Sequence, residues 1–148
     1  MTDQLRFDDV AVGARMPQQS AVVDERQLFL YSAATYNAHR IHYDRDWATR
    51  VEGHPGLLVH GPLQAALLAR AVTDWIGPEG RLLRFSFQNR ASAYPAEELT
   101  FAGTVTELHP ESATADLELA ATKGAGELLV PGTATVWLPR TRRGADEG

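Results

Sequence analysis

Residues 62–78 read PLQAALLARAVTDWIGP, and this stretch predicts one long helix. Pro62 suits the first helical position, where its missing N–H costs nothing, and Gly77-Pro78 ends the helix. Apolar residues between these limits cover most of the helical circumference, which is typical of a helix buried inside a fold. We therefore expect a central helix that the rest of the chain surrounds.

The pattern after this helix changes to the alternation of β-strands. Asp24, on the N-terminal side, is placed to cap a helix that runs to about Thr35. Helices followed by antiparallel strands predict an α+β fold with one sheet wrapped around the central helix. Such a sheet leaves strand edges open, so we expect a homodimer formed through the sheet. The predicted strands are Arg84–Gln88, Leu99–Glu107, Ala113–Thr122 and Leu128–Leu138.

The bulk properties are those of one globular domain. A length of 148 residues predicts a single domain over residues 1–139 with a disordered tail over 140–148. The net charge of −5 argues against a nucleic-acid or anionic-membrane surface. The absence of cysteine excludes disulfides, thiolate metal sites and a cysteine nucleophile. Without a signal-peptide pattern or a membrane-spanning segment, a cytoplasmic protein is expected.

Two short motifs carry the candidate chemistry. The first is the polar segment Asn37-Ala-His-Arg-Ile-His-Tyr-Asp44, and the second is His60-Gly61-Pro62 at the start of the predicted helix. The first offers groups that transfer protons, and the second offers backbone N–H donors at a helix start. Acyl-thioester chemistry needs both, because protons move while negative charge builds on the thioester oxygen.

The two motifs resemble those of the MaoC-like acyl-CoA hydratases and dehydratases of the hot-dog fold. The family pattern Ser-Gly-Asp-x-Asn-Pro-Leu-His-x-Asp aligns without gaps with Thr35–Asp44, and Ala-His-Gly-Met aligns with Val59–Pro62. The variant in this chain is most similar to the branch that includes mesaconyl-CoA-type hydratases and fungal and mitochondrial acyl-thioester dehydratases. The resemblance implies a single hot-dog domain and a hydratase or dehydratase.

The chain departs from the family at one catalytic position. The usual pair is an aspartate and a histidine five residues later, and these positions hold Asn37 and His42. Asparagine cannot take a proton at neutral pH, so we expect Asn37 to orient water. His42 is the expected general acid or base, because imidazole titrates near pH ~6.5. Gly61 is the expected oxyanion donor, because glycine at a helix start lets the thioester oxygen approach its N–H, and the resemblance implies the same role.

Five further residues are candidates for substrate contact: His39, Arg40, His60, Arg84 and Arg90. Arg40 would bind a substrate carboxylate, and the alternative is surface pairing with Asp44 or Asp46. The other two arginines flank a predicted strand, where they either meet the phosphates of coenzyme A or a carrier arm or remain solvated. His39 is either a second acid or base or a solvated loop residue. His60 is expected to hold the loop before the helix.

The leading hypothesis is a hydratase or dehydratase of an acyl-CoA or acyl-carrier thioester. No metal, flavin or nicotinamide is expected, because the sequence has no dinucleotide or phosphate-loop pattern and its loop histidines lack a clear third ligand. One alternative is a hot-dog thioesterase, which would use Glu52 or Asp44 as its carboxylate. The other is a non-catalytic subunit that binds an acyl thioester or a partner.

Overall fold

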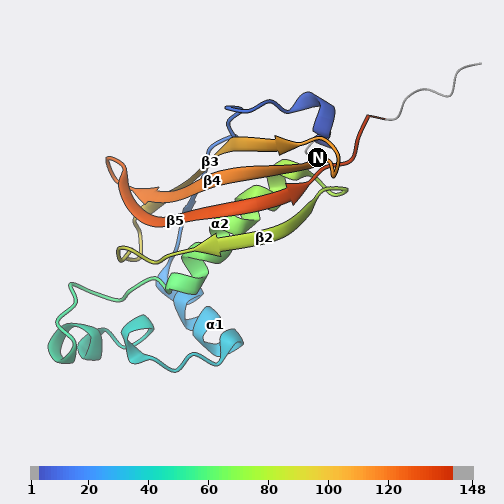
Figure 1. Ribbon diagram of the computed structural model, residues 1–148. Coiled ribbons are helices and arrows are strands. Elements are labelled where there is room, and N and C mark those ends of the chain that lie inside the picture. Colours follow the sequence, from blue (N-terminus) through green and yellow to red (C-terminus); the bar gives the residue numbers. More distant parts are fainter. Residues whose placement is uncertain (1–3, 142–148) are drawn as a thin grey trace, which may run out of the picture.

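A five-stranded antiparallel sheet curls over one long helix in the computed structural model, which describes residues 4–141 (Figure 1). The strands lie in the order β1-β3-β4-β5-β2. The prediction of an α+β fold with an antiparallel sheet around a central helix is confirmed. The main elements are β1 (Gln19–Val22), α1 (Glu25–Thr35), α2 (Gly61–Ile76), β2 (Arg81–Phe87), β3 (Glu98–His109), β4 (Thr114–Lys123) and β5 (Glu127–Trp137).

The four predicted strands are present, and a fifth was missed. β1 precedes α1 and pairs with β3 at one edge of the sheet, with Gln19 opposite Phe101. Its four residues are too few for a clear alternation, and its hydrogen bonds come from β3, which lies far along the chain. The expected order of helices first and strands afterwards is therefore wrong for this element.

Helix α2 is buried along one face only. It begins at Gly61, one residue earlier than predicted, and Gly77 ends it. Arg70 on the outer side is exposed, so the expectation of a helix surrounded on all sides is wrong. Alanines made the outer side look apolar, but their small surface costs little to expose. The buried face consists of Gln64, Ala65, Leu68, Ala71, Val72 and Ile76.

Helix α1 has the predicted cap and a sharply defined end. The Asp24 carboxylate accepts a hydrogen bond from the Gln27 backbone N–H at 2.7 Å, and the Gln27 side chain accepts one from the Asp24 N–H at 2.9 Å. Tyr36 ends the helix in the left-handed conformation at φ 54°. The Asn37 N–H then bonds the Ser32 carbonyl at 2.9 Å, which fixes where the following loop leaves the helix.

The loop between α1 and α2 extends beyond the sheet and contains two short helical turns (Figure 1). They are η2 (Arg40–His42) and η3 (Trp47–Val51). The Asp44 carboxylate accepts a hydrogen bond from the Trp47 N–H at 3.0 Å, which holds the start of η3. The expected disordered tail lies outside the described residues apart from Arg140 and Thr141. Within residues 4–141, no helix has the length and apolarity to cross a bilayer.

Candidate active site

The two sequence motifs meet at a pair of stacked imidazole rings. The rings of His42, from η2, and His60, at the N-cap of α2, have centroids 3.7 Å apart and planes 17° apart. Both are buried, with exposed fractions of 7% and 0%. Gly61 follows His60 directly, so the first amide of α2 lies next to the imidazole pair. Three residues predicted from two separate motifs therefore lie together.

One hydrogen bond fixes the tautomer of His42. Its Nδ1 lies 2.9 Å from the Leu58 carbonyl oxygen, which can only accept, so Nδ1–H is the donor. Nε2 then carries a lone pair, and it makes no hydrogen bond to any residue in the range 4–141. Burial lowers the pKa of His42, which outweighs the opposing effect of the Leu58 bond. His42 is therefore neutral at neutral pH, and its Nε2 can accept a proton.

His60, at the start of α2, contacts two residues of α1. Its Nε2 lies 2.8 Å from the Ser32 hydroxyl oxygen, and its ring meets the Tyr31 ring edge-on at 4.7 Å. Its Nδ1 is buried without a hydrogen-bond partner among the described residues. Burial, with a smaller contribution from His42, lowers the pKa of His60 to about 4. His60 therefore stays neutral and packs against His42 without adding charge.

The buried histidines predict a loss of stability in mild acid. The lowered pKa values of His42 and His60 mean that the unfolded chain binds more protons than the folded chain below the ordinary histidine pKa. The free energy of unfolding should therefore fall as the pH drops from about 6.5 towards 4. Urea denaturation across this range should show the fall, and His60→Gln should make it shallower. An identical pH dependence in that variant would contradict the assignment of His60 as a buried neutral group.

Asn37 lines a small cavity. Its side-chain oxygen accepts from the His39 backbone N–H at 3.1 Å, and its NH₂ group makes no hydrogen bond to the described part of the chain. The cavity, of about 210 Å³, is lined by Phe29, Ser32, Ala33, Tyr36, Asn37, Ala38 and Tyr43. Ser32 links this cavity to His60. The proposed role of Asn37 in orienting water stays a prediction.

Arg40 forms the surface pair with Asp44 that was the alternative to substrate binding. Its Nη2 and Nε donate to one Asp44 carboxylate oxygen at 2.6 and 3.1 Å, and the guanidinium lies 4.0 Å from the centre of the Trp47 ring. A substrate carboxylate would have to compete with Asp44 for this guanidinium. Binding of a substrate by Arg40 therefore stays a prediction.

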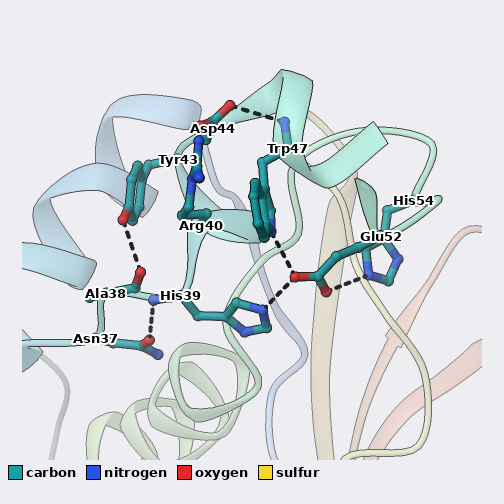
Figure 2. A network of polar contacts seen from close by, with 9 residues as sticks. All are labelled: Asn37, Ala38, His39, Arg40, Tyr43, Asp44, Trp47, Glu52 and His54. Atoms are coloured by element: carbon teal, nitrogen blue, oxygen red, sulfur yellow. Dashed lines mark hydrogen bonds and ion pairs between the residues drawn. The ribbon is translucent and has the colours of Figure 1, made fainter. Parts of the chain in front are cut away.

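The Glu52 carboxylate forms hydrogen bonds with two side chains of the same loop (Figure 2). Its Oε1 lies 3.0 Å from His39 Nε2 and accepts from the Trp47 indole N–H at 2.8 Å. The hydrogen bond with His39 is the largest of the effects that lower the pKa of Glu52. The His39 ring in turn meets the His42 ring at 5.8 Å, with an interplanar angle of 83°. Glu52 was predicted only as an alternative thioesterase carboxylate, because contacts across an irregular loop leave no periodic signal.

Asn89, which the sequence analysis missed, fills the space beside Gly61. A Cβ added to Gly61 would lie 2.4 Å from Asn89 Nδ2. Asn89 follows the end of β2, so the edge of the sheet brings it to the start of α2. No sequence signal identifies this contact, because it depends on how the sheet curls over the helix.

Neither Arg84 nor Arg90 forms a hydrogen bond or an ion pair with His42 or His60 within the described residues. Arg84 pairs with Thr135 in the β2–β5 ladder, on the face of the sheet opposite to the buried Ala134, and it lines an outer cavity of about 760 Å³. Arg90 is exposed just beyond β2 and donates to the Gln88 side chain at 3.0 Å. Their expected contacts with the phosphates of a thioester substrate stay predictions.

Comparison with known proteins assigns the chain to a family. A family model described as "Hydroxyacyl-thioester dehydratase type 2" matches residues 11–95. The chain belongs to this family. Residues 11–95 include α1, the whole loop with both histidine motifs, α2 and Asn89. The part of the chain that holds the candidate site is therefore the part that the family shares.

Two curated relatives each match about half of the chain. The chain is 46% identical over 76 residues to mesaconyl-C(4)-CoA hydratase of Chloroflexus aurantiacus. This alignment covers 51% of this chain and 26% of that protein. It is 28% identical over 78 residues to the mitochondrial hydroxyacyl-thioester dehydratase type 2 of Saccharomyces cerevisiae. This second alignment covers 53% of this chain and 27% of that protein. The matches thus span about a quarter of the length of these two family relatives.

Solved structures confirm the hot-dog fold. The unliganded R-hydratase PhaJ1 from Pseudomonas aeruginosa matches with a TM-score of 0.85 at 22% identity, over 93% of this chain and 88% of that chain. The (R)-hydratase from A. caviae matches with a TM-score of 0.81 at 23% identity, over 88% of this chain and 98% of that chain. The resemblance read from the two motifs therefore gave the right fold and the right family.

Proposed function

We propose that this protein adds water to the 2,3 double bond of an acyl thioester, or removes it in the reverse direction. The single observation that carries the proposal is the free Nε2 of a neutral, buried His42 beside the first amide of α2. The family membership and the names of the relatives, which are hydratases and dehydratases, support the same reaction class.

In the proposed hydration, His42 Nε2 takes a proton from the water that attacks C3. Electron density moves onto the thioester oxygen, where the Gly61 N–H and the N-terminus of α2 stabilise it. One such preorganised donor is worth roughly 2.7–4 kcal/mol in the transition state. The free NH₂ group of Asn37 would hold the water for attack. Adding water is redox-neutral, so we propose a reaction without a redox cofactor.

The substrate is proposed to be an acyl-CoA or acyl-carrier thioester. Mesaconyl-C(4)-CoA carries a free carboxylate besides its thioester, and Arg40, between His39 and His42 in the sequence, would bind such a group. A homodimer remains part of the proposal, because β2 is an edge strand whose Leu83 and Phe87 are 53% and 38% exposed.

Product analysis with purified protein tests the reaction class. Crotonyl-, mesaconyl- and longer enoyl-CoA are incubated with the protein, and the enoyl-thioester absorbance and free thiol are followed together. Loss of absorbance without thiol release is the expected result. Thiol release would replace the proposal by thioester hydrolysis, and tight binding with neither change would replace it by a non-catalytic subunit.

A further inference from the structure

Hydration of an enoyl thioester moves two protons, and His42 accounts for one of them. Asn37, its neighbour in the loop, cannot carry the other. We propose that His39, held by Glu52, is the second proton-transfer residue and acts at C2 of the substrate. This inference rests on the proposed function and adds to it a catalytic residue, for which the sequence left a solvated loop position as the alternative.

Glu52 is held in place as a charged partner for His39. Its Oε1 receives the Trp47 indole N–H at 2.8 Å and lies 3.0 Å from His39 Nε2. These hydrogen bonds hold the pKa of Glu52 below its usual value, so Glu52 is anionic and accepts the proton of Nε2–H. An anionic carboxylate at one ring nitrogen balances the positive charge of a protonated imidazole and fixes its orientation. The other ring nitrogen, Nδ1, then points away from Glu52 (Figure 2).

The position of His39 suits a residue that transfers a proton at the carbon next to the one where His42 acts. The two ring centroids lie 5.8 Å apart and the rings are nearly perpendicular. Acid–base groups act at about 3 Å from the atom that receives or gives the proton, so two such groups at this separation can serve neighbouring carbons. The side chain of His39 is 51% exposed whereas His42 is 7% exposed. Two titratable groups in such different surroundings can take different roles, one as the acid and the other as the base.

In the proposed step, C3 gains the water oxygen and C2 gains a proton. The water oxygen bonds to C3, its proton passes to His42 Nε2, and the π electrons of the double bond move towards the thioester oxygen. As the thioester carbonyl re-forms, C2 takes a proton from Nδ1 of protonated His39, which keeps its Nε2–H bond to Glu52. His39 ends neutral and His42 ends protonated. Exchange with solvent at the half-exposed His39 and proton loss from His42 restore the starting state.

The variant His39→Gln tests this assignment, with His54→Gln as the matched control. His54 Nε2 lies 3.9 Å from the other Glu52 oxygen, and among the described residues its ring makes no contact with the His42 ring. His39→Gln should lower kcat by at least about a hundredfold with little change in KM, since a lost acid–base group typically costs ~10²–10⁴-fold. Exchange of the C2 proton of the 3-hydroxyacyl thioester with deuterated water should slow in parallel. Glu52→Gln should show a smaller effect of the same kind, and His54→Gln none.

A second variant separates lost chemistry from lost structure. Asn37→Asp in the His39→Gln background puts a titratable carboxylate back into the same loop, and it should restore part of both kcat and C2 exchange. Wild-type kcat and exchange in His39→Gln, or a loss of kcat that Asn37→Asp does not restore, would overturn the inference while leaving hydration by the wild type intact. A wild-type protein that hydrates no enoyl thioester would overturn the proposed function and this inference together.

Discussion

Replacing His42 with glutamine is expected to lower kcat for enoyl-CoA hydration by about a thousandfold, within the ~10²–10⁴-fold range of general acid–base catalysis. The glutamine amide can still donate to the Leu58 carbonyl, which His42 Nδ1–H now does at 2.9 Å. It has no basic nitrogen, however, so water at C3 loses its base. The decay of enoyl-thioester absorbance gives kcat, and a thermal melt shows whether the variant is folded.

The matched control for this variant is His109→Gln. His109 lies at the end of β3, where it contacts Asp116 at 2.8 Å, and it is remote from the loop histidines in the chain. We expect wild-type kcat for His109→Gln.

The lowered pKa of His42 predicts a pH dependence of the reaction as well, because protonated His42 cannot act as a base. The rising limb of kcat/KM against pH should therefore report a pKa below 6.5. Near-wild-type hydration by folded His42→Gln would remove His42 from the mechanism.

Gly61→Ala is expected to cause the second large loss of activity, by about a hundredfold or more, comparable to the loss of one oxyanion-hole donor. The added methyl group would lie 2.4 Å from Asn89 Nδ2, so Asn89 must move, and the methyl group then occupies the approach to the amide. Asn89 is exposed and can move at little cost, and alanine is the better helix former. The melting temperature should therefore hold while kcat falls.

Gly56→Ala is the control for this substitution. A Cβ at Gly56 meets no atom within 4 Å in the described part of the chain, so the variant should keep both stability and kcat. The double variant Gly61→Ala/Asn89→Ala removes the clash but leaves the methyl group beside the amide. Its kcat should remain low. Full hydration activity in folded Gly61→Ala would mean that the thioester oxygen does not approach this amide.

Much of the fold was predictable because its signals are local. The cap at Asp24, the stop at Gly77 and the alternation in three long strands each depend on neighbouring residues. β1 was missed because its four residues take their pairing from β3. The outer side of α2 was misjudged because sequence periodicity does not distinguish an exposed alanine from a buried one.

The candidate site was predictable only where one residue type is required. His42 and Gly61 could be named because an imidazole at a motif position and a glycine at a helix start have a chemical reason to be there. The Leu58 carbonyl leaves no such signal, because every residue has one. The stacking of His42 on His60 and the contact of Asn89 with Gly61 depend on how an irregular loop and a sheet edge fold back onto α2.

A crystal structure of the protein with a bound enoyl-CoA would locate the reacting atoms. We expect the thioester oxygen at about 3 Å from the Gly61 nitrogen, a normal N–H···O distance, with C3 facing Nε2 of His42 across one water molecule. A thioester bound instead in the outer cavity beside Arg84, with neither the Gly61 amide nor His42 Nε2 within reach, would contradict the proposed mechanism.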